Sequence, residues 1–313
     1  MKRIVALLLT LAIACGLGMA LAEERVAPED RKETVTELDG GNQSYFRNYQ
    51  PKFWEAPSTQ PGTIERLEYT TDVYGETLNQ WANVYLPYGY DANKQYNILY
   101  FTHGTNETQD SFIGDELVKN AIDNMIEMGV CEPFIMVCPT YYYDYETRAT
   151  NHQVFVDEVR NDLMPAAETK YSTYAETADA AGFAASREHR AFSGYSQGSG
   201  VCWTISYRML DWAKWFMPMS YSTPDYLPNL KKAMVDFGEA GQDIYFYICT
   251  GGKRDLAYEG TVALANAMIA DDAFSFGTDP SVNNFYVAIS KEIHQTLKGR
   301  FNLYNAFLDG FMR

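Results

Sequence analysis

The sequence predicts an α/β fold in which helices cover both faces of a mostly parallel central sheet. Short apolar runs, typical of strands buried on both faces, alternate along the chain with segments that have helical spacing. One of these runs leads into a Gly-x-Ser-x-Gly pattern and then a further predicted helix, in the order strand, sharp turn, helix. No internal repeat and no low-complexity linker interrupts the alternation, so one large domain is expected.

The first 22 residues are expected to be a secretory signal peptide. Lys2 and Arg3 supply its basic end, residues 4–17 its apolar stretch, and residues 20–22 (Ala-Leu-Ala) a small-residue cleavage site. The apolar stretch is too short for a transmembrane span. We therefore expect a secreted, extracellular protein.

Acidic side chains dominate the rest of the chain. The 313 residues carry a formal net charge of −16, and loss of the signal, with its two basic residues, makes it −18. Such a charge opposes binding to nucleic acid or to an anionic membrane. It suits a secreted enzyme that acts on a neutral polymer.

Residues 23–60 are predicted to form a polar N-terminal arm that packs along the domain formed by residues 61–313. The arm has no sustained periodicity, and its expected aromatic anchors are Phe46, Tyr49, Phe53 and Trp54.

Four cysteines follow the signal, and three of them lie in or beside apolar segments. Buried free thiols are therefore at least as well supported as disulfides. The four are Cys131, Cys138, Cys202 and Cys249. None has the spacing of metal ligands, so we expect neither a metal nor another cofactor.

Eight segments are predicted to be strands. The first two, residues 63–72 and 79–86, flank a turn at Gly75 and should pair antiparallel. The others are short apolar runs at residues 97–102, 134–138, 191–193, 215–219, 244–250 and 285–289. Helices are predicted at residues 115–128, 151–168, 201–214, 229–240, 258–270 and 300–311. Strands that alternate with helices in this way form a mostly parallel sheet.

The stretch Gly194-Tyr195-Ser196-Gln197-Gly198 lies between a predicted strand and a predicted helix. In that context Gly-x-Ser-x-Gly forms a nucleophile elbow, which indicates the α/β-hydrolase fold. The small residues at both ends let the strand and the helix approach closely. A Gly- and Ser-rich turn without chemistry is the alternative. We predict that Ser196 is a catalytic nucleophile.

A serine hydroxyl needs a base within hydrogen-bond reach, and the base needs an acceptor that orients it. In this fold the chain order is Ser, acid, His, each on a loop after a strand. Only one of the four histidines, His294, follows Ser196, and it lies just after the last predicted strand. An exposed loop histidine is the alternative for His294.

Asp255 is the predicted acid because it lies on the loop that follows the strand at residues 244–250. Its alternative role is the N-cap of the next helix. The rival carboxylates are Glu259, Asp271 and Asp272, which lie in or after that helix, and Asp279.

An oxyanion hole needs two N–H donors. The backbone of Gln197, directly after the nucleophile, is one expected donor, and Gly104 or Thr105 on the loop after the third strand is the other. His103 is expected to hold this loop in place rather than to transfer a proton.

Aromatic residues make up 15% of the chain, and residues 141–145 read Tyr-Tyr-Tyr-Asp-Tyr directly after a predicted strand. Strand ends define the site in such folds. Tyr141 and Tyr142, with Tyr195 beside the nucleophile, are therefore expected to bind substrate by stacking on a sugar or phenolic ring. An ordinary packed loop is an equal alternative for the tyrosine run.

With these residues in place, the chain from about Arg66 onward resembles the feruloyl esterase branch of carbohydrate esterase family 1, which is related to the esterase D group. The stretches that carry the resemblance are residues 84–90 (Val-Tyr-Leu-Pro-Tyr-Gly-Tyr), 98–104 (Ile-Leu-Tyr-Phe-Thr-His-Gly), 187–190 (Arg-Glu-His-Arg), 194–198 and 250–252 (Thr-Gly-Gly), with Asp255 and His294. The resemblance implies a metal-free, secreted serine esterase that removes feruloyl or acetyl substituents from plant cell-wall xylan through a Ser-His-Asp triad and an acyl-enzyme.

The chain departs from the family pattern at two places. Thr105-Asn106 follows His-Gly where relatives often have a glycine run, which leaves the second oxyanion donor open. Gln295-Thr296 follows the base where relatives often carry an aromatic residue, which leaves the acyl group open. Two alternatives remain: a carbohydrate-binding protein on a catalytically weak hydrolase scaffold, and an acyltransferase that uses the same triad.

Overall fold

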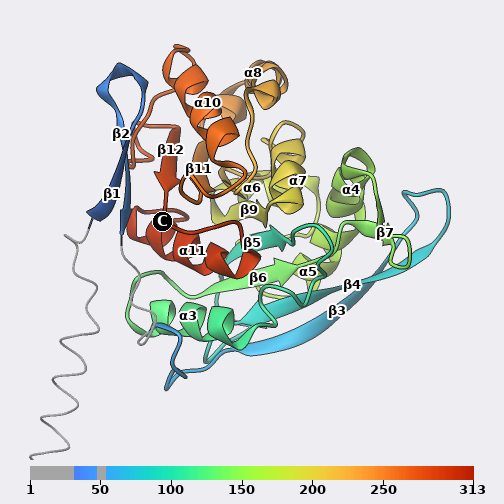
Figure 1. Ribbon diagram of the computed structural model, residues 1–313. Helices are drawn as coiled ribbons and strands as arrows, with labels where there is room; N and C mark the ends of the chain where they lie inside the picture. The colour runs from blue at the N-terminus through green and yellow to red at the C-terminus, as the bar shows by residue number, and fades with distance from the viewer. Residues whose placement is uncertain (1–31, 48–53) are drawn as a thin grey trace, which may run out of the picture.

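The computed structural model of the chain describes residues 32–47 and 54–313, which fold around one eight-stranded sheet (Figure 1). The expected signal peptide, the first residues of the expected arm, and the anchors Tyr49 and Phe53 lie outside the described residues.

Every predicted strand is present in the sheet, whose order is β12-β11-β10-β9-β5-β6-β4-β3. The six strands from β12 to β6 pair parallel, while β4 and β3 are added antiparallel at one edge. The bounds are β3 Thr63–Thr71, β4 Leu78–Leu86, β5 Asn97–Thr102, β6 Phe134–Cys138, β9 Arg190–Tyr195, β10 Trp215–Met219, β11 Tyr245–Thr250 and β12 Phe285–Ile289. The predicted mostly parallel sheet is confirmed.

The connections change direction at β5. The chain leaves β5 through a helix to β6 on one side and later returns to β9 on the other side. The loops that follow β5 and β9 therefore diverge and leave a crevice at the carboxyl ends of these strands, where ligands bind in open α/β sheets.

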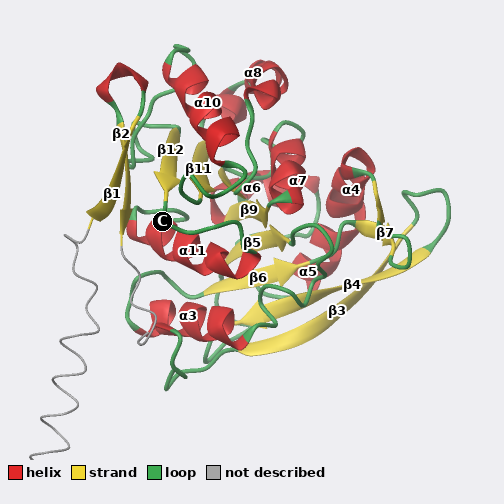
Figure 2. Cartoon of the chain, in the orientation of Figure 1, coloured by secondary structure: helices red, strands yellow, loops and turns green. Residues whose placement is uncertain are grey.

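Helices cover both faces of the sheet (Figure 2). Helices α3 and α11 pack on one core, and α4 to α8 and α10 pack on the other. Side chains of the parallel strands alternate between the two cores: Phe246 and Ile248 of β11 enter one, and Tyr247 and Cys249 the other. The bounds are α3 Glu116–Glu127, α4 His152–Glu158, α5 Met164–Lys170, α6 Ala180–Ala185, α7 Gln197–Ser206, α8 Leu227–Asp236, α9 Glu239–Gln242, α10 Tyr258–Ile269 and α11 Gly299–Leu308.

The helix after the nucleophile was predicted at residues 201–214, and both bounds are wrong. Helix α7 begins at Gln197, within the Gly- and Ser-rich stretch, and ends at Ser206. Its first turn has poor intrinsic helix propensity, but close packing against β5 requires small residues there. A Cβ on Gly198 would lie 2.3 Å from the carbonyl oxygen of Thr102.

Two other predicted helices are each divided. The segment at residues 151–168 consists of α4, a π-helical turn at Val159–Leu163 and α5. Pro165 lies in the first turn of α5 and has no N–H to donate, so the wider turn accommodates a break in the helical ladder. The segment at residues 229–240 consists of α8 and α9, separated at Gly238, whose φ is +57°.

Part of the expected arm forms a hairpin of β1 (Lys32–Glu37) and β2 (Gln43–Arg47) beside β12 (Figure 1). The Ser44 hydroxyl accepts from the N–H of Ile289, at 2.9 Å, and the Tyr45 N–H donates to the Tyr286 hydroxyl, at 2.7 Å. Phe46 is buried, as predicted, and so is Trp54. A second short hairpin, β7 (Tyr142–Asp144) with β8 (Ala149–Thr150), and helix α6 were not predicted.

The four cysteines after the expected signal are free thiols, and all but Cys131 are buried. No helix within residues 32–47 and 54–313 is long and apolar enough to cross a membrane.

A buried ion pair joins Glu168 of α5 to Arg190 at the start of β9. The guanidinium donates Nε–H to Oε1 and Nη2–H to Oε2 of the carboxylate, each at 2.7 Å, and both side chains are almost completely buried. The hydroxyls of Tyr100 and Thr173 also donate to Glu168. This network anchors the nucleophile strand at the end opposite to Ser196.

We predict that Glu168→Ala lowers the free energy of unfolding by about 3–5 kcal/mol, because it leaves the Arg190 guanidinium buried without a counter-charge. Chemical denaturation measures this change. Asp236→Ala is the control, since its pair with Lys232 is exposed and should contribute less than about 1 kcal/mol. Equal losses for the two variants would contradict the prediction.

Candidate active site

Ser196 lies at the sharp turn between β9 and α7 and has a strained backbone, with φ 54° and ψ −116°. Its N–H donates to the carbonyl of Met219, at 2.8 Å, which ties the turn to β10. A Cβ on Gly194 would lie 2.2 Å from the carbonyl oxygen of Gly198. Glycine at 194 is therefore a steric requirement of this turn.

The structure brings Ser196, His294 and Asp255 together in a chain of hydrogen bonds. His294 Nε2 lies 2.9 Å from Ser196 Oγ, and His294 Nδ1 lies 2.8 Å from Asp255 Oδ1. Because the carboxylate only accepts, Nδ1 carries the proton and Nε2 is free to accept from the serine hydroxyl. The arrangement can activate Ser196 as a nucleophile.

Asp255 is buried and accepts three further hydrogen bonds. The donors are the Ser220 hydroxyl, at 2.8 Å, and the N–H groups of Gly251 and Ala257, each at 2.9 Å. Burial acts to raise the pKa of Asp255, but the hydrogen bonds from His294 and these donors outweigh it and hold that pKa below its usual value. Asp255 therefore stays ionised beside the imidazole.

Sequence reasoning missed Ser220, which follows β10 directly and also has a positive φ, 54°. Its N–H donates to the Cys249 carbonyl, at 2.7 Å, and its hydroxyl orients Asp255. The signal that could have found it is a serine placed directly after the strand next to the nucleophile strand.

The second oxyanion donor was expected on the loop after β5, at Gly104 or Thr105. The Gly104 N–H is already occupied, because it donates to Glu107 Oε2, at 2.8 Å. Neither the Thr105 N–H nor the Gln197 N–H donates to a residue in the described part of the chain. The geometry therefore favours Thr105 over Gly104 as the partner of Gln197.

Hydrogen bonds to side chains hold the loop after β5 in place. The Asn106 N–H donates to the Tyr142 hydroxyl, at 3.0 Å, and the Asn106 side chain accepts from Arg148, at 2.6 Å. A Cβ on Gly104 would lie 2.9 Å from Glu107 Oε2, so a larger residue at 104 would displace this carboxylate. Glu107 was not singled out from the sequence, although it lies three residues after the His-Gly pair.

His103 has a structural role, as expected. Its Nδ1–H donates to the Gly104 carbonyl and its Nε2 accepts from the Thr140 hydroxyl, each at 2.8 Å. Burial lowers the pKa of His103 to about 4, so the ring is neutral near pH 7 and both nitrogens are occupied.

The prediction that Tyr141 and Tyr142 stack on a substrate ring is wrong for both residues, because their rings are buried. The Tyr141 ring stacks on His103, with centroids 4.5 Å apart. The Tyr142 hydroxyl accepts a hydrogen bond from the N–H of Asn106, on the loop after β5. Tyr195 is also buried, although it lines the cleft, and its hydroxyl accepts from the N–H of Gln295, at 2.7 Å. Tyr195 thus positions the loop that carries His294.

A cleft of about 620 Å³ lies over Ser196. Leu256 and Leu297 give it apolar walls, and Glu107 is the one carboxylate among the described residues that line it. The remaining lining residues are Gly104, Thr105, Tyr195, Ser196, His294, Gln295 and Thr296. The cleft is therefore large enough for an acyl or alcohol group of moderate size, with the nucleophile at its floor.

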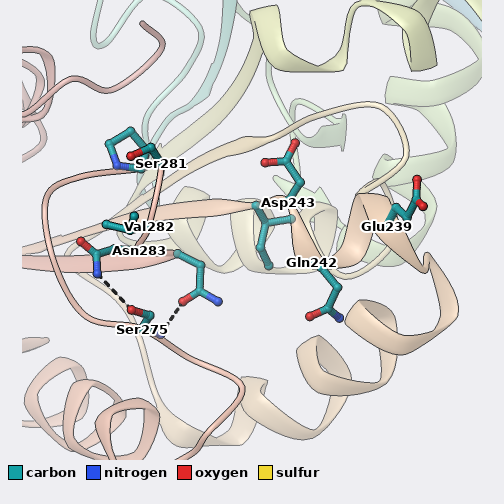
Figure 3. Close-up of a pocket in the computed structure, with 10 residues that line it drawn as sticks. Glu239, Gln242, Asp243, Ser275, Ser281, Val282 and Asn283 are labelled. Carbon is teal, nitrogen blue, oxygen red and sulfur yellow. Dashed lines mark hydrogen bonds between the residues drawn. The ribbon is translucent and has the colours of Figure 1, made fainter.

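Another hollow, of about 550 Å³, is lined by Asp243, Ser281 and Asn283 among others (Figure 3). It lies at the opposite end of the sheet, since its lining residues Ile244 and Asn284 directly precede β11 and β12. Its carboxylate Asp243 is paired with Arg187 and Lys214. This hollow contains none of the residues around Ser196, so the cleft at the carboxyl ends of the strands is the candidate active site.

Known proteins resemble the chain in sequence. Residues 79–203 match the protein family named Esterase. The chain is 35% identical over 247 residues to endo-1,4-beta-xylanase Y of Acetivibrio thermocellus, a match that covers 77% of this chain and 22% of that protein. The chain thus spans about a fifth or less of the length of the curated relatives it matches.

Solved structures resemble it over nearly their full length. The feruloyl esterase module from Clostridium thermocellum, complexed with sinapinate, is 32% identical, with a TM-score of 0.77 and coverage of 90% of this chain and 96% of that one. A CE1 ferulic acid esterase from Anaeromyces mucronatus, in complex with ferulic acid, is 19% identical, with a TM-score of 0.65 and coverage of 85% and 97%. These likenesses confirm the predicted α/β-hydrolase fold.

We predict that Glu107→Ala lowers kcat for a nitrophenyl ester about tenfold or more, with little change in KM. Without its acceptor, the Gly104 N–H no longer fixes the loop that carries the Thr105 donor, and a misplaced donor loses part of its contribution to the transition state. Glu107→Gln should retain most of the activity, because its amide oxygen can accept the same bond.

Steady-state kinetics of both variants, with the exposed Glu146→Ala as control, checks this prediction. A kcat for Glu107→Ala within about twofold of the wild type, where loss of an oxyanion donor costs far more, would show that the loop does not need this bond.

Proposed function

The chain belongs to the feruloyl esterases of carbohydrate esterase family 1, which are carboxylic ester hydrolases, and on this basis we propose that it releases feruloyl groups from plant cell-wall xylan. One observation carries the proposal: the Ser196–His294–Asp255 hydrogen-bond chain lies at the floor of a cleft in a chain that matches nearly a whole feruloyl esterase module.

In the proposed reaction the Ser196 hydroxyl attacks the ester carbonyl while His294 Nε2 takes its proton. The negative charge that develops on the carbonyl oxygen is stabilised by the N–H groups of Gln197 and Thr105. The intermediate then collapses to an acyl-serine and expels the sugar alkoxide, which receives the proton from His294. Water then attacks the acyl carbon while His294 takes its proton. The bond between the acyl carbon and Ser196 Oγ breaks, Oγ takes the proton back from His294, and the acid is released. Asp255 stabilises the imidazolium in both halves.

Feruloyl is favoured over acetyl as the acyl group. The solved relative that is 32% identical over 96% of its length is described as a feruloyl esterase module and is complexed with sinapinate. The apolar side chains of Leu256 and Leu297 suit a phenolic ring. A polar Gln295-Thr296 pair follows the base, so contacts with the ring would come from Leu256 and Leu297.

We further propose that the protein is secreted, as the sequence of residues 1–22 indicates.

We predict that the protein hydrolyses methyl ferulate and feruloylated xylo-oligosaccharides with a higher kcat/KM than their acetylated counterparts. Ser196→Ala should lower kcat by several orders of magnitude, because the nucleophile is lost. Chromatography of the released acids measures this, with the exposed Ser281→Ala as control. Near-wild-type activity of Ser196→Ala would refute the proposal, and preferential transfer of the feruloyl group to added sugar would identify a transferase.

We predict that Asp255→Asn lowers kcat about 10⁴-fold and changes KM little. An amide can present an N–H to His294 and favour the wrong tautomer, which has this effect in a related triad. Asp271→Asn and Asp272→Asn are the matched controls, since both residues follow α10 at the far end of the crossover. If Asp255→Asn keeps more than about a tenth of the wild-type kcat, far above that expectation, Asp255 is not the catalytic acid.

A further inference from the structure

A further hollow, of about 350 Å³ and called the second hollow below, lies beside the cleft over Ser196 and is distinct from the hollow in Figure 3. The loop between β11 and α10 lines both the cleft and this second hollow. Between β11 and α10, Leu256 lines the cleft, whereas Lys253 and Arg254 line the second hollow. Since a residue spans at most about 3.6 Å, the backbones of Arg254 and Leu256 are no more than about 7 Å apart.

The segment after β12 connects the two hollows in the same way. Lys291 lines the second hollow, and His294, three residues later, lines the cleft. The Gly252 N–H donates to the Glu292 carbonyl, at 3.0 Å, so the two segments are fixed to one another. A short oligosaccharide bound through an ester at Ser196 can therefore reach the second hollow.

This second hollow, named here the basic hollow, is lined by Val35, Thr36, Gly252, Lys253, Arg254, Tyr258, Ile289, Ser290 and Lys291. Three of these residues are cationic and none is acidic, in a chain with 41 acidic and 25 basic residues. The cleft over Ser196 and the hollow at the opposite end of the sheet carry carboxylates and no Lys or Arg. The basic hollow therefore differs in charge from its surroundings.

Lys253 and Arg254 are exposed, and the side chain of neither forms an ion pair or hydrogen bond within residues 32–47 and 54–313. Other arginines of the fold, such as Arg187 and Arg190, are paired with carboxylates. Two unpaired cations on adjacent residues, on the loop that carries the triad acid, have their donors available for an anionic ligand.

We propose that the basic hollow binds the carboxylate of an acidic sugar on the same polysaccharide whose ester is cleaved at Ser196. The inference rests on the proposed function. An Arg guanidinium and a Lys ammonium form charge-assisted hydrogen bonds with carboxylates. Glu107 in the cleft repels a carboxylate, which directs an acidic sugar away from the cleft and towards Lys253 and Arg254.

The test compares two feruloylated xylo-oligosaccharides, one neutral and one that carries a uronic acid, with methyl ferulate as a small reference. At low ionic strength the wild type should prefer the acidic oligosaccharide. Lys253→Ala/Arg254→Ala should reduce the ratio of kcat/KM for acidic over neutral oligosaccharide about tenfold, mainly through KM. Lys253→Arg/Arg254→Lys should keep the ratio, because both charges remain, and added salt should weaken it.

Lys94→Ala/Lys232→Ala is the matched control, since it removes two exposed charges outside both hollows. A wild type that cleaves methyl ferulate but shows no preference, or a control that loses the ratio equally, would overturn the inference and leave the proposed function intact. A wild type that cleaves none of the three substrates would refute the proposed function, and the inference with it.

Discussion

The site depends on how closely α7 approaches the ends of β5 and β9. Gly198 touches the backbone at Thr102 and Gly194 touches the backbone of Gly198, with no room for a Cβ at either glycine. This approach forces Ser196 into a left-handed conformation that costs on the order of 1–3 kcal/mol. The packing of α7, whose residues from Gly198 to Ser206 are all buried, offsets that strain. The same approach sets Gln197 beside the loop after β5, where a developing oxyanion can be bound from both sides.

Rigidity around the triad comes from complete use of hydrogen-bond donors and acceptors. Asp255 accepts from four groups, and one of them, Ser220, lies directly after β10 rather than on the loops that carry the triad residues. His103 uses both ring nitrogens, and the Tyr195 hydroxyl accepts a backbone N–H. A buried polar network of this kind is stable only when its members are paired. His294 remains partly exposed and lines the cleft over Ser196.

The sequence was sufficient for the sheet, the nucleophile turn and the three residues that meet there, because each follows from strand periodicity or from chain order in a parallel sheet. It was insufficient where tertiary contacts decide. Helix α7 begins four residues early because packing overrides the low helix propensity of Gly198 and Gly200. Tyr141 and Tyr142 follow a strand end, as a rim would, but strand order does not reveal that their rings turn inward. Glu107 and Ser220 are recognisable only once the loops are in contact.

Glu107 explains how the loop after β5 is held without a run of glycines. A glycine run leaves backbone N–H groups exposed and mobile, whereas here one N–H is satisfied by a carboxylate and the next is held in place beside it. The carboxylate has a second consequence, because ester hydrolysis converts a neutral group into an anion in the same cleft. A negative charge on the wall then repels the acid product more than the ester substrate. One side chain thus holds the loop proposed to bind the oxyanion and disfavours retention of the acid product.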